Sequence, residues 1–131
     1  RRLVAWFDGK FYAEVGAPLL QEKMIKRLFY RQSPDATMLR QSMRAATEHM
    51  EMLGALLDHH RWLTGTTLTM ADLAAAAHIS VADYLGGIDW TGHDTVRDWY
   101  ATLKSRPSFR PLLDGRMGPL LPPPHYADVN F

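Results

Sequence analysis

The sequence predicts an all-α fold of helices joined by short loops, followed by an irregular tail. Apolar residues recur at helical spacing through most of the 131 residues, and no segment shows the two-residue alternation of a β-strand. Residues 68–73 carry a nearly complete start signal for one helix. Beyond Gly115 the chain is too rich in proline to continue as regular helix.

The first helical pattern runs from about residue 2 to residue 31. Its apolar positions include Val4, Phe7, Phe11, Val15, Leu20, Met24, Ile25, Leu28 and Phe29. Gly16 and Pro18 interrupt this pattern, because proline lacks an N–H group and crowds the carbonyl four residues earlier. We therefore expect either a kink near Glu14 or a break into two helices.

The second helix is expected to begin at Ser33, with serine as the N-cap and Pro34 as the first helical residue, and to reach about His60. Methionines 38, 43, 50 and 52 are interpreted as core residues rather than as an adaptable binding surface. The stripe expected to face the core consists of Leu39, Met43, Ala46, Met50, Leu53 and Leu57.

A capping box predicts that the third helix begins at Thr69. The Thr69 hydroxyl can accept a hydrogen bond from the N–H of Asp72, and the Asp72 carboxylate can accept one from the N–H of Thr69. Leu68 and Leu73 stand at the positions of the accompanying hydrophobic staple. Asp72 is also a conceivable catalytic base, but its place in the capping box favours a structural role.

The rest of the third helix, residues 70–85, is apolar on nearly every face, which is typical of a central helix surrounded by others. Gly86-Gly87 supplies its stop signal. At 1.5 Å per residue it would be about 24 Å long, which is too short for a membrane span.

Two further helices are expected after a loop that contains Trp90. The fourth runs from about Asp94 to Ser105, and its buried side consists of Val96, Trp99, Tyr100 and Leu103. Pro107 ends it, and Pro107-Ser108-Phe109 opens a short last helix that reaches about Leu113.

Composition narrows the functional classes. Fifteen basic and fourteen acidic residues give a net charge of +1, so neither nucleic acid nor a membrane surface is an expected partner. Lys23, Lys26, Arg27 and Arg31 form a basic cluster, which we interpret as a solvated helix face. The chain has no cysteine, which suits a cytoplasmic protein, and its six histidines show no metal-ligand spacing. No signal peptide pattern is visible, and a start without methionine suggests a piece of a longer protein.

The first helix carries more aromatic residues than one packing face needs, namely Trp6, Phe7, Phe11 and Tyr12. One interpretation is that some of these residues line a pocket or a partner surface. The more economical interpretation is that all of them belong to the core and an interface.

Several motifs together resemble the all-helical C-terminal domain of cytosolic glutathione S-transferases over residues 1–113. They are Trp62-Leu63-x-Gly65-x-x-x-Thr69-x-Ala71-Asp72, the alanine-rich helix after it, Trp99-Tyr100, and Arg106-Pro107-Ser108-Phe109. The resemblance implies an orthogonal bundle of about five to six helices, with residues 114–131 as an extended proline-rich tail. The segment from Pro122 to Phe131 is further similar to bacterial members of the family close to a cell-division protein that binds FtsZ.

The resemblance also implies a division of labour between two domains. In this family an N-terminal thioredoxin-like domain, which has no counterpart in residues 1–131, holds glutathione and stabilises its thiolate. This chain alone is therefore not expected to be active, and it contains no expected catalytic residue or metal ligand. The helical domain would supply a wall of the electrophile pocket and part of a homodimer interface. The pocket candidates are Phe11, Tyr12 and Val15, with Tyr126 from the tail as a cover.

Two functions remain open for the parent protein. As an enzyme it would conjugate glutathione to a hydrophobic electrophile. As a non-catalytic binding module it would engage a protein partner, for example a cell-division filament, through its surface and tail. The apolar tail residues Leu120, Leu121, Tyr126, Val129 and Phe131 either pack on their own domain or anchor a partner, and packing is the more economical reading.

Overall fold

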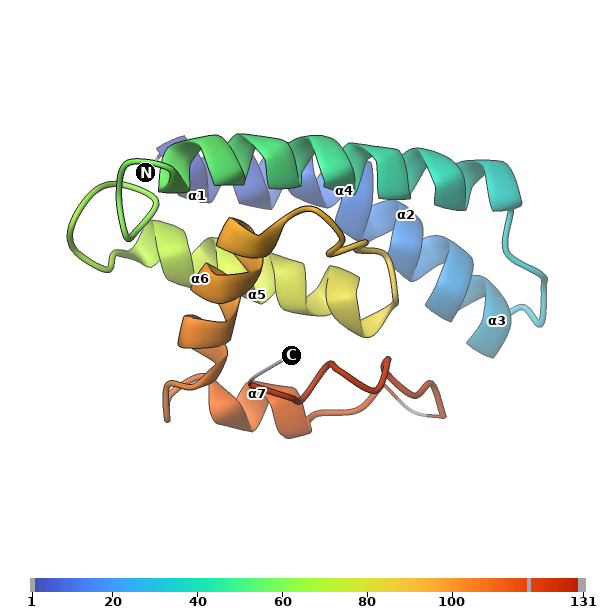
Figure 1. Ribbon diagram of the computed structural model, residues 1–131. Coiled ribbons are helices and arrows are strands. Elements are labelled where there is room, and N and C mark those ends of the chain that lie inside the picture. The colour runs from blue at the N-terminus through green and yellow to red at the C-terminus, as the bar shows by residue number, and fades with distance from the viewer. Residues whose placement is uncertain (1, 118, 130–131) are drawn as a thin grey trace.

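The computed structural model describes residues 2–117 and 119–129 and consists of packed helices (Figure 1). No β-strand occurs in these two ranges, which contain only the isolated bridges Trp62–Gly65 and Met117–Leu120. The helical segments are α1 (Arg2–Trp6), the π-helical η1 (Phe7–Gly16), α2 (Ala17–Leu19), the π-helical η2 (Leu20–Ile25), α3 (Lys26–Leu28), α4 (Ala36–Leu57), α5 (Met70–Tyr84), α6 (Asp94–Lys104) and α7 (Arg110–Asp114).

The first five segments form one continuous helical run, so the second of the two alternatives, a break at Gly16 and Pro18, does not occur. Gly16 keeps helical dihedral angles, φ −63° and ψ −53°. The N–H of Ala17 donates to the carbonyl of Tyr12, five residues earlier, and this wider turn accommodates the proline ring that follows. The run passes behind α4 and then turns away from it over α2 and α3 (Figure 1).

Helix α4 begins after Asp35, not at Ser33. The Asp35 carboxylate accepts hydrogen bonds from the N–H groups of Thr37 and Met38, at 2.8 and 3.2 Å. Its backbone is extended, with φ −77° and ψ 113°, so Pro34 precedes the cap instead of following it. The expected N-cap and first helical residue were therefore each two residues too early.

The core-facing stripe of α4 was predicted correctly except at Met43: Ala46, Met50, Leu53 and Leu57 are buried, and Leu39 is half-buried against the core. Met38 and Met43 are 38% and 37% exposed, so their assignment to the core was wrong. The reason is tertiary, because the first helical run diverges from the N-terminal turns of α4 and covers them only in part (Figure 1).

Helix α5 is the central helix and contacts α1, η1 and α6. Its buried residues include Ala75, Ala76, Ile79 and Ala82, so small side chains line much of the contact with its neighbours. None of the described helices is long and apolar enough to cross a lipid bilayer.

The start of α5 contains the capping box. The Thr69 N–H donates to Asp72 Oδ2 at 3.0 Å, and the Thr69 hydroxyl accepts from the first turn. Asp72 is fully buried, and its Oδ1 also accepts from the N–H of Leu63 at 2.9 Å and from Nε1 of Trp99 at 3.0 Å. Asp72 therefore joins α5 to the preceding loop and to α6. Leu68 and Leu73 are half-buried against the core.

The tail packs on its own domain over the described residues. Tyr126 is 4% exposed, and its ring meets that of Tyr84 edge-on, with 5.1 Å between centroids. The Tyr84 hydroxyl donates to the Leu120 carbonyl and accepts from the N–H of Met117 at 2.8 Å. His125 Nε2 donates to Asp83 Oδ1 at 2.9 Å. Phe131, which the sequence also offered as an anchor, lies outside the described residues.

Removal of the capping interactions is expected to destabilise the domain in two distinct steps. Thr69→Ala loses one cap and should cost about 1 kcal/mol of unfolding free energy. Asp72→Ala should cost about 3 kcal/mol, because two buried donors, from Leu63 and Trp99, and the part-buried N–H of Thr69 then lack an acceptor. Chemical denaturation measures both, with the exposed Thr66→Ala as control. Equal, small effects of all three substitutions would contradict the role given to Asp72.

Candidate functional site

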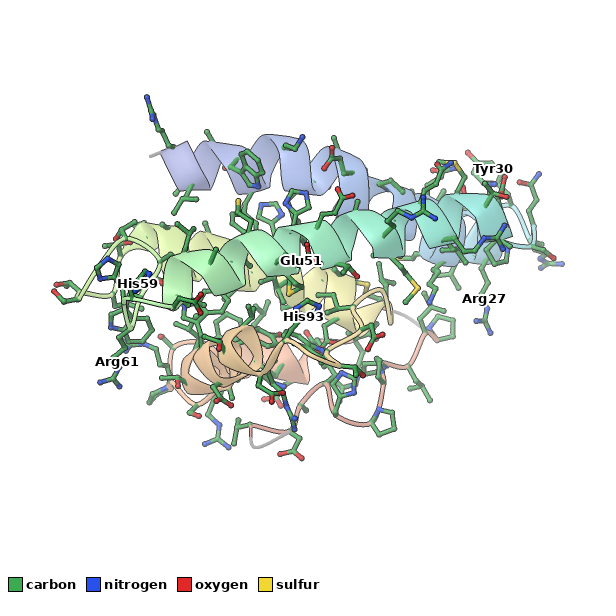
Figure 2. All side chains as sticks on the ribbon, turned by 45° about the horizontal axis from the view of Figure 1, so that its top comes forward. Arg27, Tyr30, Glu51, His59, Arg61 and His93 are labelled. Atoms are coloured by element: carbon green, nitrogen blue, oxygen red, sulfur yellow. The ribbon has the colours of Figure 1, made fainter. Side chains whose placement is uncertain are left out.

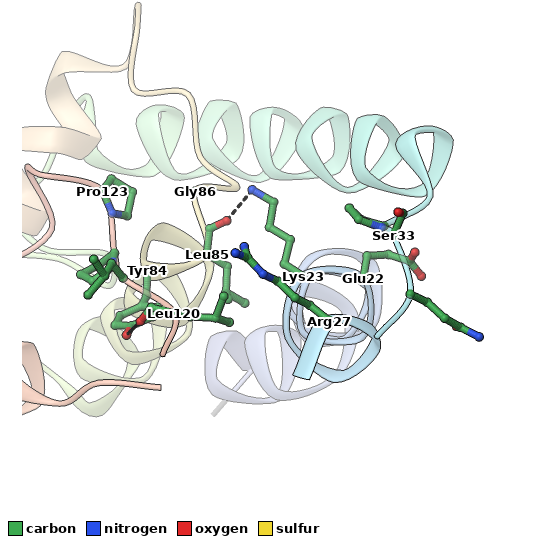
Figure 3. Close-up of a pocket in the computed structure, with 13 residues that line it drawn as sticks. Glu22, Lys23, Arg27, Ser33, Tyr84, Leu85, Gly86, Leu120 and Pro123 are labelled. Atoms are coloured by element: carbon green, nitrogen blue, oxygen red, sulfur yellow. Dashed lines mark hydrogen bonds between the residues drawn. The ribbon is translucent and has the colours of Figure 1, made fainter. Parts of the chain in front are cut away.

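A groove with a volume of about 560 Å³ lies between the end of the first helical run and the tail (Figure 3). Residues of η2 and α3 form one wall, and residues 120–123 of the tail form the other. Residues 84–86, at the C-terminal end of α5, and residues 32–34, before α4, complete the lining. Arg27 lies at the end of the molecule opposite His59 and Arg61, so the groove is remote from the capping box (Figure 2).

Lys23 reaches across the groove to the C-terminal end of α5. Its Nζ donates to the Leu85 carbonyl at 2.7 Å, and burial lowers the pKa of the Lys23 ammonium (Figure 3). Gly86 makes room for this contact, since a Cβ atom built there would lie 3.3 Å from Lys23 Nζ. Gly86 also has φ +70°, a conformation that favours glycine.

Among the described residues that line the groove, Glu22 is the one carboxylate, and its hydrogen bonds are to residues that do not line the groove. Its Oε1 accepts from Lys26 Nζ at 2.7 Å and from the N–H of Asp35 at 2.8 Å. The hydrogen bond from Lys26 is the main reason why the pKa of Glu22 lies below its usual value. Glu22 points towards Ser33, away from Lys23 and Arg27 (Figure 3). It ties α3 to the start of α4.

Apolar side chains of the tail face these cations. Leu120, Leu121, Pro122 and Pro123 line the groove, and Leu121 is 81% exposed. The nearby Tyr84 hydroxyl is already bonded to the tail backbone. The groove therefore offers positive charge at one wall and an apolar surface at the other, which is suited to binding and orienting a small organic molecule.

The sequence-based pocket candidates lie elsewhere. Phe11 and Val15 have no exposed surface, because η1 is packed against both α4 and α5, and they do not line this groove. Their place in the wall of an electrophile pocket stays a prediction. Tyr126 is buried against Tyr84 and does not line the groove, although its tail neighbours do. Tyr12 is 44% exposed but also lies outside the groove, with its ring centroid 6.4 Å from that of His78.

The residues that sequence reasoning missed are Lys23 and Arg27, which it assigned to a solvated face. The available signal was the coincidence of a basic cluster with an apolar tail, but only the fold brings the two together.

A second polar feature lies inside the core. His49 is 4% exposed, accepts from Trp6 Nε1 at 3.1 Å through Nδ1, and donates to Glu14 at 2.9 Å through Nε2. This bond from His49 lowers the pKa of Glu14. Among the described residues, no group of three or more histidine or acidic side chains is arranged to hold a metal ion.

Comparison with known proteins connects this fold to a family. The family model described as "Glutathione S-transferase, C-terminal domain" matches residues 36–102, just over half of the chain. The chain belongs to this family. This match confirms the predicted all-α fold and, independently, the resemblance that the sequence motifs carry.

The relatives extend over the whole chain. It is 47% identical over 131 residues to FtsZ-localized protein A of Caulobacter vibrioides and spans 58% of that protein. A glutathione S-transferase structure from Rhodospirillum rubrum F11 matches the whole chain with a TM-score of 0.94 and 47% identity. The match covers 59% of the Rhodospirillum rubrum chain. The structure of FzlA from C. crescentus matches the whole chain with a TM-score of 0.95 and 46% identity, and the match covers 58% of the FzlA chain. The chain therefore spans less than two thirds of these relatives.

The glycine that makes room for Lys23 gives a test of the groove geometry. Gly86→Ala should lower unfolding free energy by about 1–2 kcal/mol, because alanine is strained at a positive φ and its Cβ displaces Lys23. Gly92→Ala is the matched control, since Gly92 also has a positive φ, +81°, but a Cβ atom there meets nothing within 4 Å, so that variant should show the cost of backbone strain alone. Thermal unfolding of both variants measures the difference. Equal melting temperatures would contradict the tight approach at Gly86.

Proposed function

We propose that this domain supplies the acceptor-binding wall of a glutathione S-transferase. The observation that carries the proposal is the groove, whose volume of about 560 Å³ and apolar tail wall suit a small hydrophobic molecule. By the family resemblance, glutathione would be held mainly by a thioredoxin-like domain outside these residues. We also propose a cytoplasmic homodimer, as is usual for the family.

In the proposed reaction the glutathione thiolate attacks an electrophilic carbon of the acceptor. A carbon–sulfur bond forms, and with an aryl halide the halide ion leaves with its bonding electrons. The part of this chain is to hold the acceptor against Tyr84, Leu120 and Leu121 in an orientation that exposes the reacting carbon. Positioning of this kind raises the rate by reducing the entropy lost on the way to the transition state.

Conjugation of 1-chloro-2,4-dinitrobenzene by the full-length gene product tests the proposal. Leu121→Ser should raise KM for the acceptor about threefold, because it removes exposed apolar surface from the groove, and leave KM for glutathione unchanged. Leu112→Ser is the control, since Leu112 is 46% exposed and lies outside the groove. Rates no higher than the uncatalysed background, with aryl halides and epoxides alike, would count against catalysis.

A second function has its own support. The 47% identity to FtsZ-localized protein A covers all 131 residues and therefore includes the tail. We propose as an alternative that the parent protein is a binding module for a cell-division filament, with the docked tail as part of a preformed surface. The exposed Leu121 would then be a contact for the partner instead of a substrate wall.

Co-sedimentation with GTP-assembled FtsZ from the same organism tests this alternative. The full-length protein should pellet with the filaments, and Leu121→Asp should reduce the pelleted fraction at an unchanged melting temperature. Leu112→Asp should pellet like the unmodified protein, because it changes an exposed leucine elsewhere. Pelleting that is no greater than that of serum albumin would exclude this partner.

A further inference from the structure

The positive charge of the chain is concentrated at one end of the molecule. Residues 22–44 contain six lysines and arginines and two acidic residues, whereas the rest of the chain contains nine basic and twelve acidic residues. This segment includes α3, the loop after it and the first turns of α4, which lie together at one end of the fold (Figure 1). The exposed cations of the segment are all arginines, namely Arg27, Arg31, Arg40 and Arg44. Such a distribution attracts acidic partners to this end.

Two neighbouring aromatic side chains project from the same end. Phe29 is 73% exposed and Tyr30 is 64% exposed. Figure 2 shows Tyr30 and Arg27 at this end of the molecule. Single exposed apolar residues are ordinary, but two adjacent rings form a patch. Aromatic residues beside arginines are the residue types that contribute most to the binding free energy of protein interfaces.

The turn that carries the two rings is held in one conformation. Arg31 has φ 51°, a left-handed conformation that is uncommon for a long side chain. The N–H of Gln32 donates to the Lys26 carbonyl at 2.8 Å, and the bond from the Asp35 N–H to Glu22 holds the rest of the loop. Backbone strain of this kind persists where the surrounding structure enforces it, and it is frequent at binding sites. The rings are thus presented in a preformed arrangement, which lowers the entropic cost of binding.

We propose that Phe29, Tyr30 and Arg31, with the arginines around them, are a docking surface for an acidic, extended segment of a partner protein. An apolar residue of that segment would pack on the two rings, and carboxylates beside it would pair with the guanidinium groups, which bind carboxylates in a bidentate geometry. Phe29, Tyr30 and Arg31 do not line the groove, so this surface goes beyond the proposed function.

Other partners match this surface less well. If the same surface of a second copy met it, like charges would face each other. A helix bound to a membrane presents a continuous apolar face, whereas here the two rings stand on a single turn. Single-stranded nucleic acid is bound along a basic groove, whereas these rings project from an exposed turn. An acidic protein segment needs only the two aromatic anchors and nearby positive charge.

Fluorescence anisotropy with labelled peptides tests the proposal on the full-length gene product. The probe is a peptide in which aspartate alternates with phenylalanine, and the comparison peptide has asparagine in place of aspartate. The aspartate peptide should bind about tenfold more tightly than the asparagine peptide. Tyr30→Ser should weaken binding of the aspartate peptide about tenfold, because it removes an aromatic anchor. Leu112→Ser, which changes an exposed leucine of α7, should leave binding unchanged.

Arg31→Gly separates binding from stability. Glycine adopts φ 51° without strain, so the melting temperature should stay the same or rise. Loss of the guanidinium should nevertheless weaken binding of the aspartate peptide about threefold. A purely structural role of Arg31 would not combine these two effects. Arg110→Gln, which changes an exposed arginine of α7, should alter neither the binding nor the melting temperature.

Three results would overturn the proposal. The first is no binding of the aspartate peptide, or equal binding by the unmodified protein and Tyr30→Ser, because the turn would then not be its site. The second is equal affinity for the aspartate and asparagine peptides, because the surface would then not select acidic segments. The third is binding of phosphatidylglycerol vesicles or of oligothymidylate that is tighter than binding of the peptide and is lost in Tyr30→Ser. The turn would then be a membrane or nucleic-acid contact.

Discussion

The buried carboxylate of Asp72 is the contact on which the arrangement of the helices depends. It accepts hydrogen bonds from the backbone of Leu63 and Thr69 and from the indole of Trp99, so one side chain joins the loop, the helix start and α6. A buried carboxylate without such partners would be strongly destabilising. Its place in the first turn of α5, where the helix dipole favours negative charge, adds to the compensation. The direction in which the central helix leaves the loop is thereby fixed.

The groove lies at the other end of that helix. Tyr84 holds the tail through Leu120 and Met117, and the Leu85 carbonyl holds Lys23. Both walls of the groove are therefore attached to the last turn of α5, whose first turn Asp72 positions. The helix is buried on most sides and transmits this placement as a rigid element. Core packing and the shape of the groove are consequently linked, and Tyr84 and Leu85 belong to both.

The sequence was informative where the interacting residues are close together in the chain. The capping box joins residues three apart, so its pattern is visible directly. Ser33 and Asp35 are both good N-cap residues, and local chemistry did not decide between them. The Asp35 N–H donates to Glu22, which lies in a different helix, so this contact is not visible in the local sequence. Periodicity identified the apolar face of the first helix. It could not show that two other helices, α4 and α5, enclose Phe11. That Arg27 and the tail line the same groove could be seen only in the folded chain.

The tail is fixed to the helical domain through a second buried carboxylate, that of Asp83. Asp83 lies in the last turn of α5, where the helix dipole disfavours negative charge, and it is fully buried. It is compensated by Nε1 of Trp90 at 3.0 Å and by Nε2 of His125 at 2.9 Å, so one of its donors comes from the tail. Lys104, itself buried, donates to the His125 carbonyl at 3.3 Å. Detachment of the tail would leave Asp83 with fewer donors in an apolar surrounding, which opposes detachment. The apolar wall of the groove is therefore held in place by an electrostatic requirement of the core, and a ligand meets a preformed surface.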